Sequence, residues 1–276
     1  METAFLAELE KEYFELLTTG KVKIIEDVKA ATSKQFSYST PQYYTGNIRS
    51  KVVLVTFNSK REYLCKGNIP KDFESYKSST KTIGEIFLES NNESEFESVY
   101  PVDVRLLNYL KPFNVFRFER DSISKNLRKL TDEKLELGLI PFLSTDFGER
   151  DFMTNYNVCK PLVDRVLRGI VTYPRQYIIF VGSCFNNILS EYIDESESFR
   201  FLLTTPNCPN QKFIAHFTRV TVNYNNRRFV AGIAESFCDE SFDSILLEKY
   251  GQESVAIINR GLLLSQPLWR ENVMNL

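Results

Sequence analysis

Residues 137–182 have the sequence LGLIPFLSTDFGERDFMTNYNVCKPLVDRVLRGIVTYPRQYIIFVG, in which two short apolar runs flank a longer periodic segment. The runs at 137–142 and 177–182 are predicted strands. Apolar residues recur at i, i+4 and i+8 between 158 and 171, which predicts an amphipathic helix. A strand, a long crossover and a second strand are typical of a parallel sheet.

A third apolar run, at 52–57, is a predicted strand whose continuous apolar character indicates burial on both faces. A helix is predicted over 4–17, because its apolar residues have helical spacing and Gly20 follows its end. Another helix is predicted after Gly182. Residues 32–50 are polar and show no sustained period, so they are predicted to be a connection.

The C-terminal part of the chain predicts a hairpin. Residues 213–222 alternate, Tyr224-Asn225-Asn226 predicts a turn, and 227–234 predicts a second strand. A helix over 242–250 is predicted to end near Gly251.

The stretch 85–103 is rich in Glu and predicts an acidic, solvated loop or insertion. Residues 1–276 are therefore predicted to form a single α/β domain with a mainly parallel sheet and a C-terminal hairpin.

Composition excludes several classes of protein. The 276 residues are 43% hydrophobic, which excludes a disordered or fibrous chain, and 34 Lys+Arg against 36 Asp+Glu give a formal net charge of −2. No global positive field attracts nucleic acid or a membrane, although a local basic groove remains allowed. Five scattered cysteines, an acidic N-terminal segment and the lack of a long apolar run predict a cytoplasmic protein that does not associate with a membrane.

The usual signatures of cofactor and hydrolase sites are missing. None of the eleven glycines forms a dinucleotide, P-loop or nucleophile-elbow motif, and His216 is the only histidine. No metal and no cofactor is therefore expected. The alternating segment around His216 predicts a structural or surface histidine. Asp146 and Asp151 follow the second strand and leave a small-molecule hydrolase open as an alternative.

Basic residues gather in two segments, 117–134 and 212–228, the second of which includes Arg227 and Arg228. These segments are either ordinary solvated faces or, if the fold brings them to one edge, a basic rim that can contact nucleic acid.

Ligands of open α/β sheets bind at the carboxyl ends of the strands, so the residues that follow each strand are candidates for a binding site. They lie in four motifs, Thr56-Phe57-Asn58-Ser59-Lys60, Ile140-Pro141-Phe142-Leu143-Ser144, Ile178-Ile179-Phe180-Val181-Gly182 and Val230-Ala231-Gly232-Ile233-Ala234-Glu235-Ser236-Phe237. In order and content, over roughly residues 1–250, they resemble the uracil-DNA glycosylase superfamily. The resemblance implies a three-layer α/β/α sandwich, a pocket for a flipped nucleobase and hydrolysis of an N-glycosidic bond.

The resemblance also implies roles for individual residues. Asn58 would orient the attacking water, and the aromatic residues would stack on the base. Glu235 stands where the family has a histidine, and a carboxylate there repels a departing base anion. The resemblance and the basic segments together predict a set of residues that bind the base or nucleic acid. They are Phe57, Lys60, Tyr63, Phe142, Ser144, Ser236, Arg227 and Arg228.

Beside the small-molecule hydrolase, two functions remain open at this point. The first is a divergent glycosylase that binds or excises a base, with DNA or a nucleotide as its partner. The second is a catalytically inactive binding or interaction protein on the same scaffold, for which a protein partner is possible. The second is consistent with the acidic balance of the chain and with the missing histidine.

Overall fold

The computed structural model of the chain describes residues 2–58, 68–89, 96–119, 122–205, 208–236 and 243–265. Its strands are β1 (Tyr44–Gly46), β2 (Val52–Asn58), β3 (Leu135–Ile140), β4 (Tyr177–Val181), β5 (Ile193–Thr205), β6 (Cys208–Tyr224) and β7 (Arg227–Ala234). Its α-helices are α1 (Glu2–Thr19), α2 (Lys23–Thr32), α3 (Phe73–Thr82), α4 (Ile86–Glu89), α5 (Phe96–Val99), α6 (Pro101–Leu110), α7 (Ile123–Glu133), α8 (Glu149–Thr154), α9 (Tyr156–Val171), α10 (Phe185–Ile188) and α11 (Ser244–Ser265).

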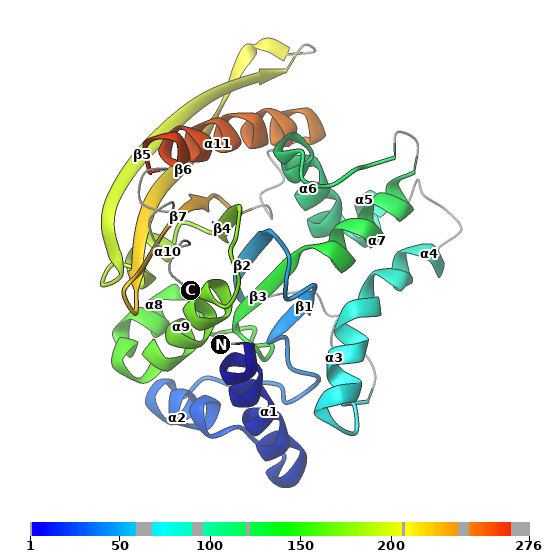
Figure 1. Cartoon of the computed structure of the whole chain (residues 1–276), viewed down its shortest axis with the longest axis vertical. Helices are drawn as coiled ribbons and strands as arrows, with labels where there is room; N and C mark the ends of the chain where they lie inside the picture. Colours follow the sequence, from blue (N-terminus) through cyan, green and yellow to red (C-terminus); the bar gives the residue numbers. More distant parts are fainter. Residues whose placement is uncertain are drawn as a thin grey trace, which may run out of the picture.

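The strands form one mixed seven-stranded sheet in the order β1-β3-β2-β4-β7-β6-β5 (Figure 1). The pairs β3–β2, β2–β4 and β4–β7 are parallel, whereas β1–β3, β6–β7 and β5–β6 are antiparallel. The α/β class, the mainly parallel centre and the C-terminal hairpin of β6 and β7 are thus confirmed. Because β3 and β4 lie on opposite sides of β2, the sheet changes its direction of winding between β2 and β4, which is where such sheets bind ligands.

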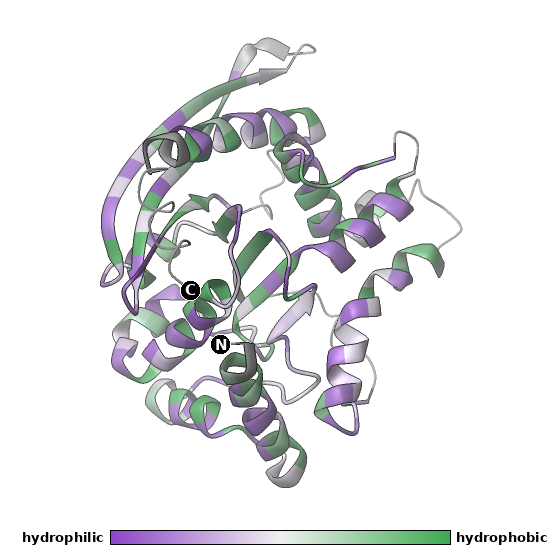
Figure 2. Cartoon of the chain, viewed as in Figure 1, coloured by the Kyte–Doolittle hydropathy of each residue, from purple (hydrophilic) through white to green (hydrophobic). Residues whose placement is uncertain are grey.

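The sheet separates two hydrophobic clusters. Val53 and Val55 of β2 pack into the first cluster with α1, α2 and α9, while Val52 and Leu54 pack into the second with α6, α7 and α11. The burial of β2 on both faces is confirmed, since all four side chains are buried. Each contributes about 1.5–3 kcal/mol relative to an exposed position. Figure 2 shows the same contrast, with hydrophobic central strands and helices that alternate in hydropathy.

The N-terminal half differs from prediction in two segments. Residues 32–50 are not only a connection, because β1 lies within them, and α2 precedes them unpredicted. Within the described part of 85–103, the chain is helical, and Phe87 and Phe96 are buried in the second cluster. The prediction of a solvated loop there is wrong for these residues, because two of their phenylalanines are buried and fix short helices against the second cluster.

The C-terminal half differs from prediction at β5 and at Gly251. β5 was not predicted, and α11 continues through Gly251 and does not end there. A Cβ at Gly251 would lie 2.0 Å from the backbone oxygen of Tyr109 in α6, so this glycine allows two helices to approach closely. In the described ranges, every helix is too short or too polar to span a membrane.

Candidate functional site

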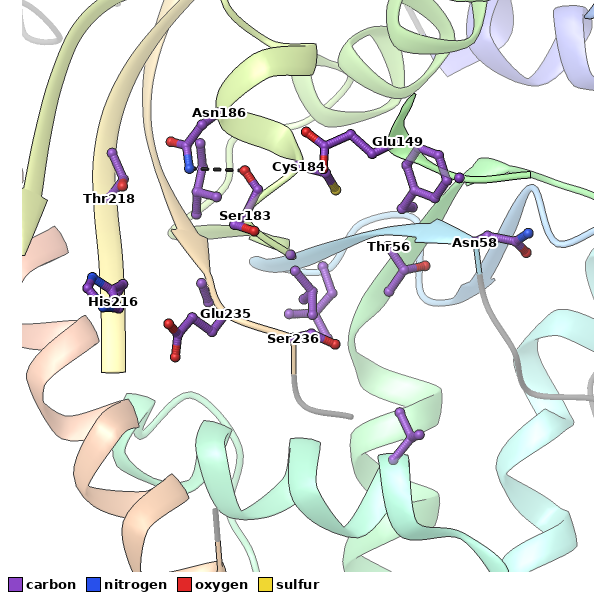
Figure 3. Close-up of a pocket in the computed structure, with 18 of the residues that line it drawn as sticks. Thr56, Asn58, Glu149, Ser183, Cys184, Asn186, His216, Thr218, Glu235 and Ser236 are labelled. Atoms are coloured by element: carbon purple, nitrogen blue, oxygen red, sulfur yellow. Dashed lines mark hydrogen bonds between the residues drawn. The ribbon is translucent and has the colours of Figure 1, made fainter. Parts of the chain in front are cut away.

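A cavity of about 920 Å³ opens at the carboxyl ends of β2, β4 and β7, at the winding change between β2 and β4 (Figure 3). Polar side chains from several segments line it. Among them are Thr56 and Asn58 of β2, Ser144, Asp146 and Glu149 after β3, Ser183 and Asn186 after β4, His216 and Thr218 of β6, and Glu235 and Ser236 after β7. Residues distant in sequence therefore meet because the parallel strands end at one edge.

The segment after β3 holds Asn58 in place. Its side-chain Nδ2 donates to the carbonyl oxygen of Ser144 across 3.0 Å, so the orientation of the amide is set by the neighbouring strand. The amide oxygen is then available to accept a hydrogen bond from a water or a ligand. A neutral amide is not a base near pH 7, so Asn58 can position a water but does not deprotonate it.

Ser144 acts on the site through its backbone carbonyl group and not through its hydroxyl group. The Oγ lies 2.7 Å from the carbonyl oxygen of Gln35 and 3.1 Å from Oδ1 of Asp146, and it accepts from the amide of Phe147. These bonds fix the turn after β3. The hydroxyl group is thus already engaged, while the carbonyl oxygen orients Asn58.

The turn after β4 begins at Gly182, which has a φ of +120°, a conformation that favours glycine. Ser183 and Cys184 follow on the cavity wall, and Asn186 donates to the carbonyl oxygen of Ser183 across 3.1 Å (Figure 3). Burial raises the pKa of Cys184 to about 12. The thiol therefore remains protonated near neutral pH and is not a nucleophile there.

His216 and Glu235 lie just beyond the last paired residues of β6 and β7, where the two strands separate. Their strands pair up to Phe217 and Ala234, so the next position in register places His216 opposite Glu235. The Tyr250 hydroxyl of α11 donates to the carbonyl oxygen of His216 and accepts from the amide of Glu235, at 2.6 and 2.9 Å. Figure 3 shows both side chains at the same side of the cavity.

The wall of the cavity is acidic. Four carboxylates line it among the described residues, whereas no lysine or arginine does; the four are Glu136, Asp146, Glu149 and Glu235. Glu136 is buried and paired with buried Lys134 at 2.9 Å, which neutralises it. The carboxylate of Glu149 accepts a hydrogen bond from the side-chain amide of Asn187 at 2.8 Å.

Of the aromatic residues predicted to contact a base, the structure places one at the cavity and one in the core. Phe57 lines the cavity and stacks on Phe147, with ring centroids 6.0 Å apart and planes 8° from parallel. Phe142 is only 1% exposed and packs against Tyr38 and Tyr43 in the first cluster, so it lies in the core. Lys60 and Tyr63 fall outside the described residues.

The two arginines of the predicted rim lie away from the cavity. Arg227 begins β7, whose opposite end reaches the cavity, and donates to the carbonyl oxygen of Val171. Arg228 pairs with Asp194 and Glu195. The other basic segment contains α7, which packs beside β1 at the far edge of the sheet. Arg227 and Arg228 therefore do not form a rim with the basic residues of α7.

Of the two aspartates that the sequence offered as hydrolase residues, one lies at the cavity and the other does not. Asp146 lines the cavity, but Asp151 accepts from the amide of Gly148 at 3.1 Å and lies 3.7 Å from Lys34, so it caps α8. Sequence reasoning did not place His216 in the site. The alternation of its strand predicts on which face of the strand the side chain of His216 lies. Only the pairing of β6 with β7 shows that this face borders the cavity.

No protein-family model matches the chain, and no curated protein matches it significantly. Within the described ranges, His, Cys, Asp and Glu side chains form no group of three or more that could hold a metal ion.

Proposed function

We propose that the chain is a divergent uracil-DNA glycosylase-like protein of three-layer α/β/α architecture. In this proposal its cavity binds a nucleobase of nucleic acid and the N-glycosidic bond of that nucleotide is hydrolysed there. One observation carries the proposal: Asn58, Glu235 and Ser236, which the resemblance placed after separate strands, all line one cavity at the winding change of the sheet. A volume of about 920 Å³ is ample for a base and its sugar.

The arrangement of Asn58 supports a role in placing water. Its amide nitrogen is held by the carbonyl oxygen of Ser144, which leaves the amide oxygen to hold a water against the sugar. Alignment of a nucleophile can supply a large part of a rate enhancement without a change of protonation. Phe57 stacks on Phe147 and lines the cavity, where its ring is placed to contact a base.

One observation favours the second function, a binding protein without turnover. Glu235 lines the cavity at the position that the resemblance gives to a histidine, and its carboxylate cannot stabilise a departing base anion. A protein that only holds the base has no such need. The two functions are separated by whether the free base is released.

The test incubates the protein with labelled single- and double-stranded oligonucleotides that carry uracil or another altered base, followed by detection of abasic sites. Asn58→Ala is compared with Asn157→Ala, which removes an exposed asparagine of α9 outside the cavity. Release by the parent chain and the control, but not by Asn58→Ala, supports a glycosylase. Salt-sensitive binding without release supports the binding protein, and the absence of both rejects the proposed function.

A further inference from the structure

β5 and β6 continue past the rest of the sheet as a two-stranded ribbon. β6 pairs with β7 only between Phe217 and Tyr224, whereas its pairing with β5 continues to Cys208. The ribbon comprises residues 198–204 of β5 and 212–218 of β6, and it extends from the cavity wall past the end of β7. Figure 1 shows the two strands running together beyond the central strands and along α11.

One face of the ribbon is fixed on α11. Phe201 contacts Tyr250 with ring centroids 6.0 Å apart, and Phe213 packs against the second cluster. Lys249 of α11 also donates to the carbonyl oxygen of Thr204. Because side chains alternate along a strand, the residues between these phenylalanines lie on the opposite face of the ribbon.

That opposite face, the cavity face of the ribbon, begins at the cavity. Ser198 and Thr218 are paired in register and both line the cavity, as His216 does (Figure 3). His216 is paired with Arg200, which is exposed. Since alternate residues of a strand share a face, the cavity wall continues without interruption onto the outer part of the ribbon.

An apolar pair follows outward along the cavity face. Leu202 is paired with Ile214, and the two residues are 58% and 42% exposed. On the same face the exposed Arg200 precedes this pair and the exposed Lys212 follows it. With a rise of about 3.3 Å per residue, Lys212 lies about 13 Å beyond His216. Adjacent exposed apolar side chains with a polar border indicate an interaction surface.

The charge of this part of the chain favours a polyanionic partner. Residues 198–234 contain no Asp or Glu, although these make up 36 of the 276 residues of the chain. Five basic residues lie in the same segment, namely Arg200, Lys212, Arg219, Arg227 and Arg228. Lysine and arginine on an exposed surface bind the phosphates of nucleic acid. Arg200 and Lys212 are the two that the cavity face of the ribbon presents.

We infer that the cavity face of the ribbon binds a single strand of nucleic acid beside the nucleotide whose base enters the cavity. This inference rests on the proposed function and adds the surface that holds the rest of the strand. Arg200 and Lys212 contact phosphates, while Leu202 and Ile214 pack against bases or sugars. The bases of a duplex are paired and stacked, so apolar contact with their faces requires a single strand.

The experiment measures binding of the full chain to a fluorescent single-stranded DNA oligonucleotide over a series of salt concentrations. Arg200→Gln with Lys212→Gln should lower the slope of log K against log salt concentration by about 1.4, or about 0.7 for each lost phosphate contact. Arg227→Gln with Arg228→Gln is the matched control. It removes the same charge from exposed residues at the opposite end of β7 and should leave the slope unchanged.

The apolar pair provides a second measurement. Leu202→Thr with Ile214→Thr should weaken binding of the single strand by about tenfold and leave the salt slope unchanged. Threonine keeps a high strand propensity, and both positions are exposed, so the unfolding temperature should match that of the parent chain. A duplex of the same sequence should bind more weakly than the single strand, and equally to the parent chain and to this variant.

The outcomes separate this inference from the proposed function. A salt slope that is unchanged in the Arg200 and Lys212 variant, an equal loss in the control, or a preference for the duplex overturns the inference. Binding to phosphatidylserine vesicles without binding to the single strand overturns it in favour of a lipid surface. In each case the proposed function stands if base release depends on Asn58. If the parent chain neither binds an oligonucleotide nor releases a base, both are rejected.

Discussion

The hydroxyl group of Tyr250 lies 2.6 Å from the carbonyl oxygen of His216, to which it donates. It also accepts the amide hydrogen of Glu235 across 2.9 Å. A side chain of α11 thus completes the hydrogen bonding of β6 and β7 at the point where the two strands separate. The position of Glu235 in the cavity depends on this helix.

We expect Tyr250→Phe to reduce the free energy of unfolding by about 1–3 kcal/mol, because it leaves a carbonyl and an amide without their partner. Urea unfolding measures the change. Tyr173→Phe is the matched control, since the Tyr173 hydroxyl accepts from Arg49 in an exposed hydrogen bond and its loss should cost far less. Equal losses in the two variants would show that the Tyr250 hydroxyl has no special structural role.

Gly251→Ala should destabilise the protein although alanine is the better helix former. The new methyl group would lie 2.0 Å from the backbone oxygen of Tyr109, so α6 and α11 must move apart. Overpacking of this kind costs about 1–3 kcal/mol. Gln252→Ala, one residue further along the same helix and exposed, is the control and should be neutral or slightly stabilising. A stable Gly251→Ala variant would contradict the close packing of the two helices.

Glu12→Ala should reduce the free energy of unfolding by more than most substitutions of partly exposed residues. Arg165 is only 2% exposed, and its guanidinium donates to Glu12 at 3.1 Å and to the carbonyl oxygen of Leu139 at 2.9 Å. Removal of the carboxylate leaves a buried charge, which costs about 3–5 kcal/mol. Glu8→Ala removes the neighbouring, more exposed pair with Arg168 and should cost below about 1 kcal/mol. Thermal unfolding of the two variants should therefore differ clearly.

Stability should begin to decrease above about pH 9, through the cysteine, and fall further above about pH 10, through the tyrosines. Burial raises the pKa of Tyr44 and of Cys159 to about 12, and it also raises the pKa of Tyr76 and Tyr109. The folded chain then keeps protons that the unfolded chain has already lost. Unfolding releases protons in this range, so its free energy is unaffected below the unfolded pKa and falls as the pH rises toward the folded one.

Urea unfolding at a series of alkaline pH values measures this loss, and tyrosinate absorbance follows the ionisation directly. We expect the exposed tyrosines to titrate first and the buried ones only as the chain unfolds. A single titration step near the ordinary tyrosine pKa, with unchanged stability, would contradict the burial of these hydroxyl groups.

The predictable part of the fold is the part with a strong local signal. The continuous apolar run of β2 and the periodic face of α9 specify their elements without reference to the rest of the chain. β5 has no such signal, because its first half is an exposed edge with the sequence IDESES and obtains its conformation by pairing with β6. Gly251 looks like the end of a helix in the sequence, because glycine often follows a helix. In the structure it lies inside α11, where the lack of a side chain allows close contact with Tyr109.

The same limit applies to the candidate site. Asn58 and Ser236 were accessible to sequence reasoning because they directly follow recognisable strands that end at a common edge. His216 was not, because its place at the cavity depends on the register of β6 against β7. Phe142 follows β3 closely, but it packs inward on Tyr43, a choice that depends on side-chain packing and not on position along the chain.

The order of the strands has a consequence for synthesis of the chain. β2 pairs with β3 on one side and β4 on the other, and both leave the ribosome long after β2 does. Until Val181 has emerged, an apolar strand has at least one edge without a partner. Such an edge is open to pairing with other chains. The strand that supplies Asn58 is therefore open to such pairing during synthesis until β4 has emerged.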